Sequence, residues 1–214
     1  GLFQRAILQG GGPRWIRRRL REARGVIASG EAQGGVLMAA LKCDADPAKA
    51  LDALRSRSVE ELLAAAKTAE GPFSAGEQWG PVIDGVVIPD DPWTLWRDGK
   101  QADVPLICGG NADDGSIFPV PAGVVDVWQY KEWVRASFPG DPDGVARAFA
   151  PNLRDDVPAT VHEIYSDSLA VEPARFAARC NASRGRKAYL YFFSRVSPGA
   201  EKRGIGAYHG AETA

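Results

Sequence analysis

The pattern of apolar positions along the chain predicts three strands. Residues 2–9 (LFQRAILQ) form a short apolar run that stops at the glycines of GGGP, and residues 102–115 contain a second run, VPLICGG, that ends in a turn rich in Gly and Asp. Residues 187–196 (KAYLYFFSRV) form a third run, which is aromatic and apolar. Short apolar runs that end at turn residues are typical of strands buried in a sheet.

Helical patterns follow the first of these runs. Residues 14–42 are expected to be helical, with an interruption at the small residues ASGEAQGG. Two short helices come next. Asp46 is expected to cap the first of them, which has Pro47 at its first position, and Ser58 with Glu61 three residues later forms a capping box for the second.

The pattern changes again in the second half of the chain. Residues 71–100 are rich in Gly, Pro and Asp and contain one β-branched run, GVVIP, so they are expected to be irregular with short strands. Residues 126–150 and 158–183 are expected to be helical, with a break near Pro173. Strands that alternate with helices predict an α/β protein with a largely covered sheet.

In such a sheet, ligands and catalytic groups gather at the carboxyl ends of the strands. Three stretches of this chain lie just past predicted strand ends: GGGP, GGNADDGSIF and, after a longer loop, GAYHGAE. Catalytic or ligand-binding residues are therefore expected in these stretches.

Composition and charge narrow the class of partner. The 214 residues are 45% hydrophobic, which is enough for a sizeable core, and 26 basic against 27 acidic residues give a net charge of -1. No overall field therefore favours nucleic acid or an anionic membrane. The local run RWIRRRLREAR at residues 14–24 could form a phosphate-binding or membrane-surface helix, but its thin apolar stripe favours the solvated face of an ordinary helix.

Other features exclude further classes. Cys43, Cys108 and Cys180 have neither CxxC nor paired spacing, which argues against a zinc site or a disulfide framework. No apolar run approaches the roughly 18 residues of a membrane span. The chain begins GLFQRAILQ without Met or an export signal, so we expect it to be a piece of a longer protein whose compartment the sequence leaves open.

Two candidate catalytic groups follow the second and third strands. Asp113 and Asp114 lie in a turn with Gly115, where adjacent aspartates are usually solvated turn formers whose side chains bond nearby backbone amides. His209 lies in a Gly-rich turn near the end of the chain, where a histidine is more often an ordinary surface residue. Together, however, a buried carboxylate and a histidine make two thirds of a hydrolase triad, because the carboxylate orients the imidazole and stabilises its protonated form.

The nucleophile of such a triad is missing. No G-x-S-x-G elbow occurs in the 214 residues, and the nearest stretch, PFSAG with Ser74, follows a helix tail instead of the apolar strand that an elbow requires. The backbone amides of QGGGP could cradle an anion, although a triple Gly after a strand is more often a flexible exit. Cys108 is expected to be an inert core thiol and His162 a structural residue.

The order of four motifs resembles the type B carboxylesterase and cholinesterase family of α/β-hydrolases over essentially the whole chain. GLFQRAILQGG is similar to the family's G-L-F-x-R-A-I-x-Q-S-G, and the stretch from WGPVIDG to GGNADDGSIF is similar to P-V-x-D-G and G-x-N-x-D-E-G-x-x-F. The segment YSDSLAVEPARFAARCNASRGRKAYLYFFSR resembles the helix and strand that precede the family's histidine, and GAYHGAE resembles G-x-x-H-G-x-E. The resemblance implies that residues 1–214 form a single partial α/β-hydrolase domain, truncated at both ends.

The resemblance also implies roles for individual residues. His209 falls on the general base, and Asp114 falls where the family usually has a glutamate as the acidic member. Phe118 and Ile117 fall where the family lines its acyl or alcohol pocket, and Trp15 is expected to face the same gorge. The nucleophilic serine and the oxyanion glycines would lie upstream of the present chain.

Three departures from the family pattern accompany these roles. Asp114 in place of Glu shortens the reach by one methylene, so either the backbone compensates or the acid orients His209 less well. Gly10 replaces the usual Ser after the first strand. Cys43 sits where many relatives carry a disulfide cysteine, but no partner precedes it, so that bridge is not expected.

The function implied by the resemblance is hydrolysis of carboxylic esters through a Ser-acid-His triad and an acyl-enzyme, by the full-length protein and not by this chain alone. The partner is then a small-molecule ester, with no metal or organic cofactor, no nucleic acid and no membrane span, and the oligomeric state stays open. The alternative is a catalytically silent member of the family that acts as a binding or adhesion module.

Overall fold

The computed structural model describes most of the chain, and its residues form two compact units. The described residues are 2–14, 16–25, 27–43, 46–68 and 79–213. Of these, the first unit contains 2–14 and 95–213, and the second contains 16–68 and 79–94. That residues 1–214 form a single partial hydrolase domain stays a prediction.

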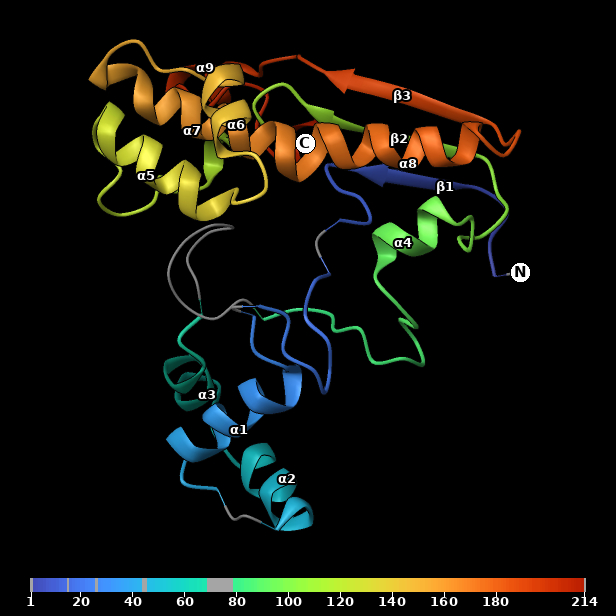
Figure 1. Ribbon diagram of the computed structural model, residues 1–214, viewed down its shortest axis with the longest axis vertical. Helices are drawn as coiled ribbons and strands as arrows, with labels where there is room; N and C mark the ends of the chain where they lie inside the picture. Colours follow the sequence, from blue (N-terminus) through green and yellow to red (C-terminus); the bar gives the residue numbers. More distant parts are fainter. Residues whose placement is uncertain (1, 15, 26, 44–45, 69–78, 214) are drawn as a thin grey trace. The chain divides into compact units, whose positions relative to one another are not determined.

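The first unit is built on a parallel three-stranded sheet with the order β1-β2-β3 (Figure 1). Its strands are β1 Ala6–Gln9, β2 Leu106–Asn111 and β3 Ala188–Phe193. Each corresponds to one of the apolar runs, so the prediction of an α/β fold is confirmed. Since the strands are parallel, their carboxyl ends lie at one edge of the sheet.

Helix α8, Glu172–Ala182, covers one face of this sheet. Leu106 and Cys108 of β2 are buried against the alanines of α8. Trp96 of α4, Pro92–Arg97, packs against the same cluster.

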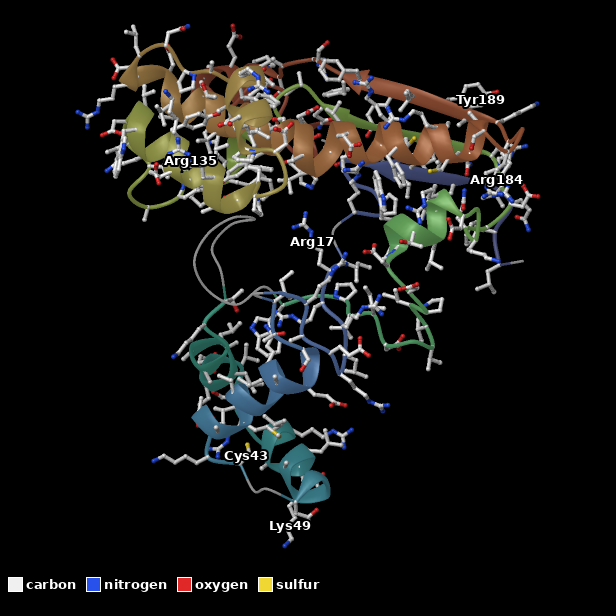
Figure 2. All side chains as sticks on the ribbon, in the orientation of Figure 1. Arg17, Cys43, Lys49, Arg135, Arg184 and Tyr189 are labelled. Carbon is white, nitrogen blue, oxygen red and sulfur yellow. The ribbon has the colours of Figure 1, made fainter. Side chains whose placement is uncertain are left out.

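The opposite face is exposed in this chain. Ile7, Ile107 and Tyr189 stand in register across the three strands, with exposed fractions of 61%, 42% and 57%. Figure 2 shows Tyr189 on β3. The expectation of a largely covered sheet therefore holds only in part, because Leu190 and Phe192 of β3, on the α8 side of the sheet, are exposed as well.

The helix before β3 does not break at Pro173. Helix α7, Val157–Ser166, continues through a π-helical turn, Asp167–Val171, directly into α8. Proline lacks an N–H and its ring collides with the carbonyl four residues earlier in a regular α-helix. The wider π turn just before Pro173 relieves this conflict, so the chain stays helical where a break was expected.

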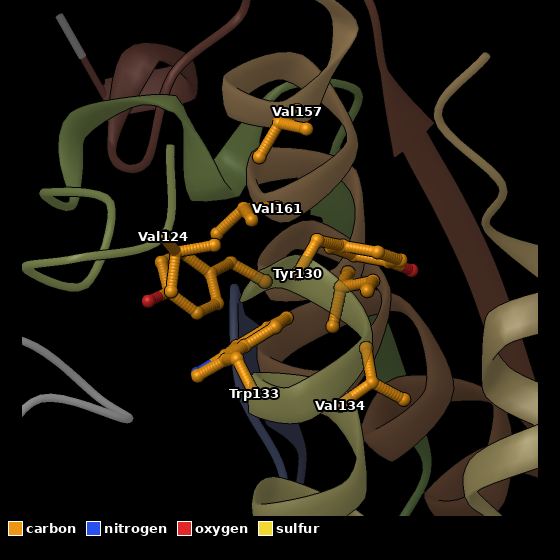
Figure 3. Packing of buried hydrophobic residues seen from close by; sticks show 8 residues of the cluster. Val124, Tyr130, Trp133, Val134, Val157 and Val161 are labelled. Carbon is orange, nitrogen blue, oxygen red and sulfur yellow. The ribbon is translucent and has the colours of Figure 1, made fainter. Parts of the chain in front are cut away.

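The largest core cluster of the first unit lies between α7 and two other helices (Figure 3). These are α5, Val127–Ser137, and α6, Pro142–Ala148, which both lie within residues 126–150, where helical structure was expected. Helix α6 begins directly after Asp141, whose carboxylate accepts a hydrogen bond from the N–H of Gly144 and so caps the helix. The cluster consists of Val124, Tyr130, Trp133, Val134, Val157, Val161, Ile164 and Tyr165.

The second unit contains three short helices: α1 Gly30–Ala40, α2 Pro47–Arg55 and α3 Val59–Ala66. Helix α2 begins at Pro47, directly after Asp46, as predicted. The capping box of α3 is confirmed, since Ser58 Oγ accepts from Glu61 N and Glu61 Oε2 accepts from Ser58 N.

The helix expected over 14–42 exists only as α1, so the prediction is wrong for the described residues before Gly30. The expected interruption at ASGEAQGG is also wrong, because α1 begins within that stretch. The backbone before Gly30 pairs with a distant segment instead: Leu20 N donates to Ile83 O, and Ile83 N donates to Arg18 O. Arg19 and Arg24 pair with the carboxylates of Asp90 and Asp91 at 2.7 and 2.8 Å. These contacts replace the intrahelical bonds of the predicted helix.

The β-branched run GVVIP forms a turn and not a strand. Asp84 Oδ1 accepts hydrogen bonds from Val86 N and Ile88 N, and both Val86 and Val87 are 83% exposed. The helix α4 that follows was not expected, although the sequence Asp-Pro at its start is a helix-initiation signal.

Short helical elements complete the fold. They are α9, Pro198–Arg203, and three 3₁₀ turns at Asp114–Ile117, Arg154–Asp156 and Ala211–Thr213. Among the described residues, no helix is long and apolar enough to cross a membrane.

Candidate active site

Two loops meet beyond the carboxyl end of β2. The first, residues 111–116, contains the paired aspartates and is called the acid loop. The second, residues 205–212, contains His209 and is called the histidine loop. Asp113 and Tyr208 form a parallel β-bridge between the two loops, which are about ninety residues apart in sequence.

Asp114 and His209 are in direct contact. The distance from His209 Nδ1 to Asp114 Oδ1 is 2.8 Å, and the Asp114 side chain is 1% exposed whereas the imidazole is 43% exposed. A carboxylate accepts a hydrogen bond, so in the neutral imidazole the proton lies on Nδ1 and the Nε2 lone pair is free. This arrangement gives a buried acid and an accessible base.

Asp114 also acts as a turn former, the role that adjacent aspartates in a turn usually have. Its second oxygen, Oδ2, accepts from the backbone N–H of Asn111 at 2.5 Å. A 3₁₀ turn begins at Asp114 and directs the carboxylate back toward the end of β2. The aspartate therefore reaches His209 at normal hydrogen-bond distance.

Gly10, at the end of β1, lies against the same pair. It has a φ of +62°, and a Cβ atom added there would lie 2.7 Å from His209 Cε1, 2.9 Å from His209 Nδ1 and 3.4 Å from Asp114 Oδ1. Gly12 is constrained differently, because its Cβ would lie 2.7 Å from the Cβ of Pro173. Close packing thus explains two of the three glycines in GGGP.

Phe118, one of the predicted pocket residues, lies beside this pair. The Phe118 ring is 6.2 Å from the His209 ring, tilted by 41°, and makes an edge contact with Tyr165. The side chain of Ile117 is exposed. His162 does not join the site, since its Nε2 lies 3.0 Å from the Phe118 carbonyl oxygen.

The other predicted residues are two that the structure does not describe and the three cysteines. Trp15 and Ser74 lie outside the described residues. Cys43, Cys108 and Cys180 are free thiols, and burial raises the pKa of the Cys108 and Cys180 thiols. Within the described part of the chain, no group of three or more His, Cys, Asp or Glu residues is placed to hold a metal ion.

Asn111 and Tyr191 were not singled out from the sequence, and Asp113 was named only as a turn residue beside Asp114. Asn111 and Asp113 bond to the histidine loop, and the motif G-x-N-x-D-E-G, which marks both positions, could have indicated this role. The Tyr191 hydroxyl is buried with no hydrogen-bond partner in the described residues. Burial and then the nearby Glu212 and Asp114 charges raise its pKa to about 12.

The chain is similar to one known family of proteins. The model of the "Carboxylesterase family" matches residues 1–143. A fumonisin B1 esterase from Sphingopyxis macrogoltabida is 28% identical over 98% of this chain and 36% of its own length, and lipase 1 from Geotrichum candidum is 26% identical over 88% and 37%. Human neuroligin-3 is 28% identical over 100% of this chain and 23% of its own length.

The fold has a similar counterpart among solved structures. Aspergillus niger EstA superimposes with a TM-score of 0.74 over 99% of this chain and 41% of its own length, at 17% identity. This likeness confirms the α/β-hydrolase type of fold. The chain spans about a third of the length of the fumonisin esterase and the lipase that it matches.

Proposed function

The chain belongs to the carboxylesterase family, and from this we propose that the protein containing it hydrolyses carboxylic esters with His209 as general base and Asp114 as the acid that orients it. One observation carries the proposal. The buried Asp114 carboxylate bonds Nδ1 of an imidazole that is 43% exposed, at the edge of the sheet where ligands of α/β folds bind.

Each residue has a defined task in the proposed reaction. A serine outside this chain attacks the ester carbonyl, and His209 Nε2 takes its proton. Asp114 stabilises the imidazolium that forms. His209 then gives the proton to the leaving alcohol, which leaves an acyl-serine. In the second half, His209 removes a proton from water, and the oxygen of that water attacks the acyl-serine. The bond from the acyl group to the serine oxygen then breaks, the acid is released, and His209 returns the proton to the serine.

The proposed substrates are small-molecule esters with an apolar group on one side of the carbonyl. Phe118 supports this assignment, since its ring is held against Tyr165 and lies next to His209. An aromatic wall beside the base favours apolar acyl or alcohol groups by burying them. Ile117 is proposed to contribute at the exposed rim of the same surface.

A catalytically silent binding module is the second candidate. The observation that favours it is the likeness to neuroligin-3, a relative whose name does not describe a hydrolase, over the whole chain. The contact between Asp114 and His209 favours the hydrolase, because a binding surface requires neither a buried acid nor its bond to an imidazole.

Hydrolysis of a short-chain chromogenic ester by the whole protein separates the two candidates. We expect His209→Ala and Asp114→Asn each to lower kcat by about 10⁴-fold. The matched control is His162→Gln, which alters the only other histidine of the chain and retains a side-chain donor for the Phe118 carbonyl. Equal rates for the wild type and His209→Ala would remove His209 from the mechanism, and no turnover by the wild type would favour the binding module.

A further inference from the structure

The acid loop holds the histidine loop through side chains other than Asp114. Asp113 Oδ2 accepts from the backbone N–H of Ala207 at 2.8 Å, and Asp113 N donates to Ala207 O at 3.1 Å. One residue further along the histidine loop, Asn111 Nδ2 donates to the carbonyl oxygen of Tyr208 at 2.8 Å. These bonds fix the two residues that directly precede His209.

Two further bonds extend the contact on both sides. Ser116 Oγ donates to Ile205 O at 2.6 Å, which fixes the start of the histidine loop. Asn111 Nδ2 also donates to the carboxylate of Glu212, so the amide uses both of its hydrogens on this loop. Asn111 is fully buried, and a buried amide is costly to leave unpaired.

The histidine loop depends on these contacts because its own backbone is permissive. Gly206 and Gly210 both have positive φ values, a conformation that glycine adopts without steric cost. The two loops approach each other closely at Gly206, where a Cβ atom would collide with the Asp113 carboxylate. A loop with this glycine content loses much conformational entropy when it is ordered, and its hydrogen bonds must offset that loss.

On its own, the hydrogen bond between Asp114 and His209 would fix one ring nitrogen but not the backbone of the histidine loop. The imidazole is 43% exposed, and a general base has to stay within hydrogen-bond reach of the proton it takes. We propose that Asn111 and Asp113 are positioning residues for His209, which hold the histidine loop so that Nδ1 meets Asp114 and Nε2 faces the substrate. This inference rests on the proposed esterase function for its catalytic consequence, but the geometry of His209 can be tested without it.

Variants that keep or remove single hydrogen bonds of these residues separate the positioning role from a general effect on stability. Asp113→Asn keeps an oxygen that accepts from Ala207 N, whereas Asp113→Ala removes it. Asn111→Asp keeps the shape but removes both donors and places a carboxylate against Tyr208 O and Glu212. Ser116→Ala removes one hydrogen bond at the loop start and serves as the milder variant if the others unfold.

Two readouts are measured on the whole protein. The first is kcat and KM for a short-chain chromogenic ester. We expect Asp113→Ala and Asn111→Asp to lower kcat by about 100-fold, as for a misplaced catalytic group, with KM within about twofold. Asp113→Asn restores kcat to within about threefold of the wild type, and Ser116→Ala lowers kcat by about threefold.

The second readout is the ¹⁵N spectrum of labelled histidine, with the His209 signal assigned from His209→Ala. We expect the Nδ1-protonated tautomer of His209 in the wild type and in Asp113→Asn, and a mixture of tautomers in Asp113→Ala and Asn111→Asp. The inference is overturned if Asp113→Ala retains both kcat and the single tautomer, or if kcat and KM change while the tautomer does not. A wild type without esterase activity refutes the proposed function only, and the tautomer then decides whether the positioning role stands.

Discussion

Gly10→Ala tests the geometry of the site most directly. The added Cβ would lie 2.7 Å from His209 Cε1, whereas ordinary van der Waals contact begins at 3.4 Å, so the imidazole must retreat by about 0.7 Å or the end of β1 must shift. The substitution also forces alanine to adopt a φ of +62°, which costs about 1–3 kcal/mol.

The catalytic cost follows from the same displacement. A ring that moves by about 0.7 Å stretches or bends a 2.8 Å bond to Asp114 to the limit of hydrogen bonding. Misplacement of a catalytic group by about 1 Å lowers the rate by about 100-fold, which corresponds to about 2.7 kcal/mol of transition-state stabilisation. We expect kcat for a short-chain chromogenic ester to fall by this factor in the whole protein.

The adjacent glycine provides the control. A Cβ at Gly11 would have no atom of the described residues within 4 Å, and its φ is not positive, so Gly11→Ala should keep the activity and stability of the wild type. A thermal melt of each variant shows whether Gly10→Ala is still folded at the assay temperature. The reasoning is refuted if folded Gly10→Ala retains kcat within about threefold, or if Gly11→Ala loses as much activity.

Further predictions concern the acid, the buried tyrosines, a helix cap and the chain by itself. Asp114→Glu should lower kcat by about tenfold or more, because the site is closed around the shorter acid, which is 1% exposed and already makes two hydrogen bonds; steady-state kinetics checks this. Burial raises the pKa values of Tyr130 and Tyr165 from 10.0 to about 12. Their contribution to the free energy of unfolding is therefore complete below pH 10 and is lost between pH 10 and 12. On titration to high pH, the absorbance of tyrosinate should appear together with unfolding. Ser58→Ala should destabilise α3 by about 1 kcal/mol, measured by hydrogen exchange of its amides. Residues 1–214 alone should not hydrolyse the chromogenic ester, since they contain no G-x-S-x-G, and turnover above the blank would contradict the assignment of the nucleophile to another part of the protein.

Local patterns in the sequence determined the elements whose signals lie within a few residues. The three apolar runs predicted the strands of the sheet, and the spacing of Ser58 and Glu61 predicted the start of α3, because a capping box uses only atoms of one helical turn. The motifs around Asp114 and His209 predicted which residues to examine at the ends of β2 and β3. They did not establish that the shorter acid reaches the histidine.

Contacts between distant segments decided the rest. Residues 14–29 have a helical pattern in the sequence, but Leu20 pairs with Ile83, and the described residues of this range are not helical. The sequence marks Gly10 only as a glycine, whereas the structure shows that the His209 ring occupies the space of a side chain. The positions of Asn111 and Asp113 against the histidine loop likewise depend on residues more than ninety positions apart. Local propensity is a property of neighbouring residues, so contacts formed by tertiary packing can override it and cannot be inferred from it.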